Sequence, residues 1–199
     1  VNSFGQAPIA GNSAGVNIAG YINAVMIAFQ QTTVNFVGQN EGNKNYKRIK
    51  KIYAMCLALV FVIEALMGAL AFICRKPLLS LFITDSSEAI AIGTLRIGIV
   101  CTTQFLLGLM EVTTGTIRGM GVSLAPMASS MIGVCGFRVF WILVVFYNYT
   151  NFQDPNDLNM LYISYPISWI ITFIVHFICY IFVSKKKIKE INSEITLQL

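Results

Sequence analysis

Charged side chains are scarce in this sequence. They make up 12% of its 199 residues, whereas a soluble domain usually carries about a quarter. Hydrophobic residues reach 56%, and the mean hydropathy is +0.68. So few charges cannot cover a surface in contact with water, so we expect the outer surface to face lipid. The net charge of +5 then needs no nucleic-acid partner, because basic flanks of membrane helices meet anionic lipid headgroups.

The residue patterns of common catalytic and metal sites are missing as well. The sequence has one histidine and no CxxC spacing, so it cannot build a metal site of the common kind. It has no glycine-rich phosphate loop and no Walker lysine, which excludes an ATP-driven motor within this chain. Its five cysteines fall in or at the ends of apolar runs, where we expect small buried hydrophobes. We therefore predict neither an enzyme nor a resident metal or cofactor.

Long apolar runs are what the sequence does contain. A helix needs about 20 apolar residues to cross the hydrocarbon core of a bilayer. Five runs qualify, at 7–37, 52–73, 89–115, 124–147 and 160–183, followed by a tail at 184–199. The runs are continuous and do not alternate between apolar and polar residues, which favours helices over a barrel. The predicted fold is an all-α, polytopic transmembrane helix bundle that forms a single lobe.

The first run, 7–37, is more polar than the others. It carries no charge but many amides, together with glycines and alanines. Small residues let helices approach closely in lipid, and amides can bond across helices. We therefore expect this run inside the bundle or beside a wet cavity.

Basic residues gather in alternate loops. Ten lie at 44–51, at 118 and at 185–189, whereas the loop after the second run has only Arg75 and Lys76, and 148–159 has none. The positive-inside rule places the first group, with the tail, in the cytoplasm, and the amino end outside. The chain starts at Val1 and shows no signal-peptide pattern, so we expect a fragment of a longer protein.

Two acids lie within the predicted spans, where an ionisable group costs about 2.5–3.5 kcal/mol to insert and is a candidate for function. Glu64 is expected either to bind a proton or cation, or to be neutral and bonded to a Ser or Asn of a neighbouring helix. Small residues surround Glu111 at helical spacing, which favours a cavity-facing acid. The alternative is an ion pair with Arg138 on the next span.

Three basic groups lie in the spans too. For Arg138 we favour a structural role, paired or bonded to a helix-end carbonyl. His176 is expected either to relay protons or to bond to a neighbour. Arg96 lies nearer a span end, where a long side chain can extend to the interface.

Several stretches resemble the multidrug and toxic compound extrusion (MATE) family in its carboxyl-terminal lobe. The first run ends in VNFVGQNEGNKN, similar to that family's VGQ-x-x-G turn before a basic loop. PLLSLFITDSSEAIAIGTLRI resembles the family's linker. TGTIRGMGVSLAPMASSMIGVCGFRVFW resembles its L-R-G-x-G turn, followed by a proline and an intramembrane arginine. The resemblance covers essentially the whole chain.

This resemblance implies a transporter of two six-span lobes in the cell membrane, which exports drugs and organic cations in exchange for Na⁺ or H⁺. This chain would hold spans eight to twelve, and its partner would be the missing amino-terminal lobe of the same protein. Some family members carry an acid about eleven residues before the arginine of the L-R-G-x-G turn. That position is Leu107 here, and Glu111 follows one helical turn later.

We therefore predict Glu111 as the acid that binds the substrate or the coupling ion, with Glu64 as second choice. The polar face of the first run is predicted to be lined by Asn17, Asn23, Gln30 and Gln31. Gly115, Gly119 and Gly121 are predicted to allow the tight cytoplasmic turn.

Two alternatives remain. A lipid-linked-sugar flippase would need a basic cavity for a pyrophosphate, for which only Arg138 and Arg96 are available. The isolated chain can also be inactive. If two lobes rock around a central cavity, one lobe alone lacks the second wall of that cavity.

Overall fold

The computed structural model describes residues 5–149 and 157–197, which form helices and short connections without any strand. The long helices are α1 (Gln6–Gly42), α2 (Tyr46–Ile73), α5 (Gln104–Gly119) and α9 (Leu158–Leu197). A short α3 (Arg75–Ser80) and α4 (Ser87–Arg96) follow α2, and a π-helical turn, Ile97–Cys101, follows α4. The fourth predicted run is one continuous rod in which α6 (Leu124–Ser130), α7 (Phe137–Phe140) and α8 (Tyr147–Tyr149) alternate with the π-helical stretches Met131–Gly136 and Trp141–Phe146. The predicted all-α class is confirmed.

The five predicted runs correspond to five helical stretches, but these differ in how well they suit a bilayer. Three are long and apolar enough to cross it, at Tyr46–Ile73, Leu124–Phe146 and Leu158–Glu190. Ser87–Cys101 and Gln104–Gly119 together make a fourth that is bent by 42°. The amides and glycines of α1 lower its hydropathy, which is why this helix of 37 residues is not among them.

The bend before α5 has a local cause. The hydroxyl of Thr102 donates to the carbonyl of Gly98, and that of Thr103 to the carbonyl of Ile99, each at 2.6 Å. Such bonds favour a bend, but Thr113, Thr114 and Thr116 make them inside α5 as well. The π-helical turn directly before the break is what distinguishes this point, because such turns are a usual cause of sharp kinks. The sequence analysis predicted a single span here and did not foresee the bend, which separates Arg96 and the π-helical turn from α5.

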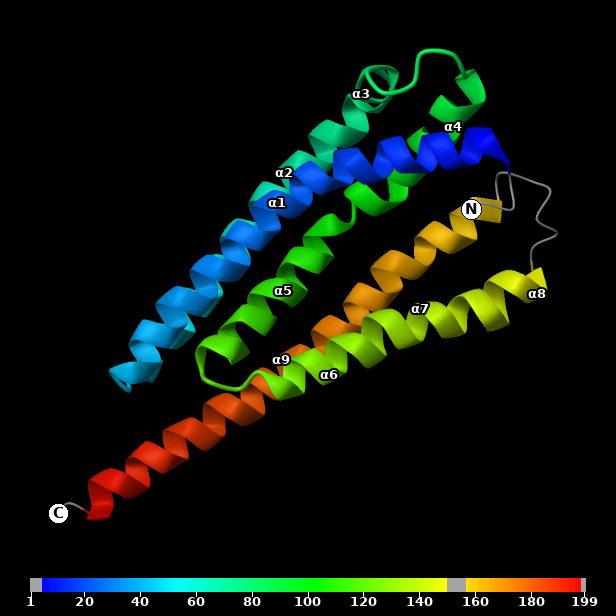
Figure 1. The fold of residues 1–199 in the computed structure, drawn as a ribbon. Coiled ribbons are helices and arrows are strands. Elements are labelled where there is room, and N and C mark those ends of the chain that lie inside the picture. The colour runs from blue at the N-terminus through cyan, green and yellow to red at the C-terminus, as the bar shows by residue number, and fades with distance from the viewer. Residues whose placement is uncertain (1–4, 150–156, 198–199) are drawn as a thin grey trace.

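Figure 1 shows how the helices are arranged. Helices α1 and α2 run side by side, α5 packs against both, and α9 packs against α5 and the α6–α8 rod. The turn after α1, the turn after α5 and the carboxyl-terminal part of α9 share one end of the bundle (Figure 1). The basic residues at 44–51, 118 and 185–189 therefore gather at that end. There, Lys187 Nζ lies 2.8 Å from Glu41 Oε1 and joins α9 to α1.

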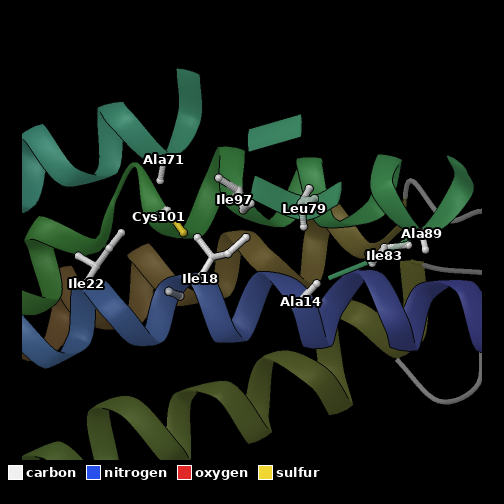
Figure 2. Packing of buried hydrophobic residues seen from close by; sticks show 10 residues of the cluster. Ala14, Ile18, Ile22, Ala71, Leu79, Ile83, Ala89, Ile97 and Cys101 are labelled. Carbon is white, nitrogen blue, oxygen red and sulfur yellow. The ribbon is translucent and has the colours of Figure 1, made fainter. Parts of the chain in front are cut away.

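Small residues hold α1 against its neighbours. At the end of the bundle opposite the basic residues, Gly11 of α1 lies against the backbone of α4. A Cβ on Gly11 would come 3.0 Å from the nitrogen of Gly93. Figure 2 shows the buried cluster around this contact, with Ala14, Ile18 and Ile22 of α1 facing side chains of α2, of the α3 region and of the π-helical turn. Close approach of backbones is the main packing device available to helices in lipid.

The predicted role of three glycines is corrected in part. Gly121 lies in the turn after α5 with φ +83°, a conformation that favours glycine. Gly115 and Gly119 instead belong to α5 and face α1. A Cβ on Gly115 would come 2.8 Å from the carbonyl oxygen of Gln30, and one on Gly119 would come 2.9 Å from that of Val34.

Candidate functional site

A cavity of about 400 Å³ lies where α1, the bent α4–α5 segment, the α6–α7 rod and α9 meet. It brings together polar and charged side chains that are far apart in the sequence. Its polar lining consists of Asn23, Arg96, Gln104, Glu111, Ser130, Arg138 and Tyr165, with Trp169 beside them. A cavity with converging polar groups inside a helix bundle is the default location of a binding site.

Glu111 is the acid of this cavity. It lies on α5, is partly buried, and accepts a hydrogen bond from Nε2 of Gln30 on α1. The predicted cavity-facing orientation is what the structure has. The alternative pair with Arg138 does not form: among the described residues, the ion pairs are Lys186–Glu190 and Lys187–Glu41. An acid bonded only to a neutral amide remains free to take up a cation or a proton.

The amides of α1 divide between two faces, which corrects the prediction of one shared polar face. Asn23 and Gln30 are seven residues apart and therefore point the same way, toward α5. Asn17 and Gln31 are exposed on another face, about a third of a turn away. Only the first two are joined to groups of the cavity.

Gln104 is a site residue that the sequence analysis missed. Its Nε2 donates to Asn23 Oδ1 at 2.6 Å and to the carbonyl oxygen of Ala19 at 3.1 Å. It is buried at the start of α5, directly after the bend. A lone amide in an otherwise apolar span is the sequence signal that would have found it.

Glu64 lies outside the cavity, in the contact between α2 and α5. Its side chain is fully buried, and neither carboxyl oxygen has a hydrogen-bond partner among the described residues. The alternative of a bond to a Ser or Asn of a neighbouring helix is thus not found among the described residues. The carboxyl group lies against Gly108, where a Cβ would come 2.8 Å from Glu64 Cδ.

His176 bonds to its neighbours, as one of its two predicted roles required. It is fully buried on α9, with Nδ1 3.0 Å from Thr114 Oγ1 and Nε2 3.2 Å from the carbonyl oxygen of Pro126. A carbonyl can only accept, so Nε2 carries the hydrogen of that bond. The ring thereby joins α9 to α5 and α6.

The two arginines of the cavity differ from their predicted surroundings. Arg138 Nε donates to Ser168 Oγ at 3.2 Å, rather than to an acid or a helix-end carbonyl. Arg96 was expected to extend to the interface, but it is only 6% exposed, and its Nη1 donates to Asn12 Oδ1 at 2.9 Å. Tyr165 lies beside both guanidinium groups. Arg96 ends α4, which packs against α1, and no local pattern revealed that its side chain points inward.

Comparisons with known proteins agree on one family. The MatE family model matches residues 1–144. A protein of Bacillus subtilis described as probable multidrug resistance protein YoeA is 23% identical over 187 residues, which cover 94% of this chain and 39% of that protein. A protein of Thermotoga maritima described as probable multidrug resistance protein NorM is 26% identical over 137 residues, covering 68% of this chain and 29% of that protein. This chain therefore spans less than half the length of these relatives.

Solved structures show the same fold. The MATE transporter VcmN of Vibrio cholerae, in its bent form, matches with a TM-score of 0.80 and 18% sequence identity. The match covers 94% of this chain and 41% of that one. A second structure of the same transporter, the D35N mutant, gives a TM-score of 0.80 at 17% identity.

Proposed function

Because this chain belongs to the MatE family, we propose that it forms the carboxyl-terminal lobe of a multidrug efflux transporter in the cell membrane. The transporter exports organic cations, and the inward movement of Na⁺ or H⁺ drives the export. The amino-terminal lobe of the same protein supplies the second wall of the transport path. The share of the relatives' length that this chain covers supports the assignment to one lobe.

One observation carries this proposal: Glu111, an acid that forms no ion pair among the described residues, lies in a cavity within the bundle. Glu111 contributes its carboxylate to the cavity, and Gln30 holds it by a single neutral bond. A carboxylate in this setting binds either an organic cation or the coupling ion. The two compete for one negative charge, so that loading the coupling ion releases the substrate.

The arrangement of helices supports alternating access by rocking. Substrate sites of secondary transporters lie near the bilayer midplane, between repeats that move as rigid bodies. Here Glu111 lies about two turns of α5 beyond the bend at Thr102 and Thr103. Closure of one end of the transport path and opening of the other then expose the carboxylate to each side in turn.

The test of this function uses the full-length protein reconstituted in vesicles, with ethidium as the transported cation. Replacing Glu111 by Gln keeps the shape of the side chain and removes its charge. We expect at least about a tenfold loss of ethidium export driven by an imposed gradient, the loss expected when a charge-assisted contact is removed. Glu88→Gln is the control, because Glu88 is exposed on the first turn of α4. Unchanged coupled export in Glu111→Gln would remove this acid from the mechanism.

The coupling ion is identified by imposing one gradient at a time. A Na⁺ gradient at equal pH and a pH gradient without Na⁺ are applied to the same vesicles. If ethidium is exported with one gradient and not with the other, the ion of the effective gradient is the coupling ion. Export with neither, in vesicles that hold folded protein, contradicts the antiporter proposal.

A further inference from the structure

The cavity that holds Glu111 also contains two cationic side chains without an acidic partner. Arg96 of α4 and Arg138 of α7 both line it. Neither belongs to an ion pair among the described residues. Two guanidinium groups and one carboxylate make this cavity more positive than a site for cations alone would require.

The partners of these arginines are all neutral. Arg138 donates to the hydroxyl of Ser168, and Arg96 to the amide oxygen of Asn12. The Nε atom of Arg96 is buried and has no hydrogen-bond partner among the described residues. A buried donor without a partner costs about 1–3 kcal/mol, and more for a charged group. The guanidinium group of Arg96 therefore keeps one unused donor in this structure, which is packed beside Gly15 of α1.

The guanidinium groups of Arg96 and Arg138 both lie beside the aromatic ring of Tyr165. The guanidinium carbon of Arg138 lies 4.0 Å from the centroid of the Tyr165 ring, and that of Arg96 lies 5.4 Å from the same centroid. Cation–π contacts offset part of the cost of holding a cation away from water. They do not remove the repulsion between two like charges, which one anion between the guanidinium groups would relieve.

From this geometry we infer that Arg96 and Arg138 form a binding site for the carboxylate of an organic anion within the transport cavity. The inference rests on the proposed transport function and extends its substrates beyond cations. A guanidinium group offers a planar pair of donors that matches the two oxygens of a carboxylate. Two such groups beside one ring provide donors for both oxygens, while Glu111 remains on the α1 side for a cation.

The experiment compares salicylate with salicylamide, which has a similar shape and no carboxylate. Binding to the full-length protein is followed by ligand fluorescence at neutral pH. We expect the wild type to bind salicylate more tightly than salicylamide. Arg138→Gln is expected to weaken salicylate binding about tenfold or more, the loss of a charge-assisted bond, and to leave salicylamide binding unchanged. Arg138→Lys, which retains the charge, is expected to lose less.

The control substitution is Arg118→Gln, because Arg118 is exposed on the last turn of α5 and does not line the cavity. Equal affinities of the wild type for the two ligands would overturn the inference, as would equal losses for both ligands in Arg138→Gln. No salicylate binding at all would also overturn it, and would indicate that another part of the transporter neutralises the arginines. If Arg138→Gln fails to fold, the affinities of the wild type and of Arg138→Lys for salicylate and salicylamide decide whether the inference holds.

Ethidium export separates this inference from the proposed function. Wild-type protein that exports ethidium but does not distinguish the two salicyl ligands retains the proposed function and loses the carboxylate site. Wild-type protein that binds salicylate selectively but exports no ethidium retains the carboxylate site and loses the proposed export of cations.

Discussion

Two acids within the apolar helices have opposite surroundings. Glu111 faces a cavity and accepts a bond from an amide, whereas Glu64 is enclosed in the contact between α2 and α5 without a hydrogen-bond partner among the described residues. Both acids are equally conspicuous in the sequence. Of the two, only Glu111 lines the cavity, and it therefore remains the acid that we propose for transport.

The contact between Glu64 and Gly108 leads to a prediction about stability. A Cβ on Gly108 would come 2.8 Å from Glu64 Cδ and 2.9 Å from Val60 Cγ2. We expect Gly108→Ala to lower the free energy of unfolding by about 1–3 kcal/mol, the usual cost of overpacking. Thermal unfolding of the detergent-solubilised full-length protein measures it.

Gly20→Ala is the matched control, because a Cβ at Gly20 meets nothing within 4 Å and this mid-helix position favours alanine. Adding Glu64→Ala should partly restore the stability of Gly108→Ala, because it removes the carboxyl group that the new methyl group contacts. An unchanged midpoint of thermal unfolding in Gly108→Ala would show that Glu64 and Gly108 are not tightly packed. Additive effects of Gly108→Ala and Glu64→Ala on that midpoint would show the same.

Among the elements, the position of α1 against α5 decides whether the polar site exists. Glycines on α5 bring its backbone close to that of α1, and the amides Asn23 and Gln30 then reach Gln104 and Glu111. The glycines were predicted to serve the turn, but two of the three serve this contact. The rotation of α1 about its axis is therefore part of the site.

Gly115 tests this contact. Its Cβ would come 2.8 Å from the carbonyl oxygen of Gln30, the residue that bonds to Glu111. We expect Gly115→Ala to move α1 away from α5 and to reduce coupled ethidium export several-fold, because small displacements of binding groups cost much of the rate. Vesicle export assays at equal protein content measure the effect.

Gly38→Ala provides the comparison, since a Cβ there would come 3.8 Å from the carbonyl oxygen of Gly119, an ordinary contact. It is expected to leave export unchanged. Equal activity of both alanine variants would mean that the close approach at Gly115 does not position Gln30.

At the scale of the whole molecule, the distribution of basic residues and the arrangement of the helices agree. Lys44 in the turn after α1, the basic residues in the first turns of α2, the turn after α5 and the lysines of α9 share one end of the bundle (Figure 1). The sequence analysis placed all of 44–51 in a loop, but α2 already begins at Tyr46. The positive-inside rule predicts that this end faces the cytoplasm. The sidedness itself stays a prediction.

Labelling of single cysteines tests the sidedness in intact cells. In the full-length protein with its native cysteines replaced by alanine, Lys189→Cys on α9 should react with a membrane-impermeant maleimide only after the cells are permeabilised. Thr84→Cys, in the connection between α3 and α4, should react from outside. Both positions are exposed, so burial does not explain a difference. The reverse pattern would invert the topology, and labelling of both from outside would contradict a membrane-spanning bundle.

The amino-acid sequence by itself determined the all-α class of this protein and the end of the bundle where the basic residues gather, whereas it missed the bend before α5 and the continuation of α9 to Leu197. The class and the basic end depend on the lengths of apolar runs and on the charges between them, which are local properties. Only the tertiary structure decided that Asn23 and Gln30 line the site while Asn17 and Gln31 do not, that Arg96 points inward, and that Glu64 has no hydrogen-bond partner among the described residues. Those outcomes depend on how each helix is rotated and bent against its neighbours, and contacts between distant residues set that rotation.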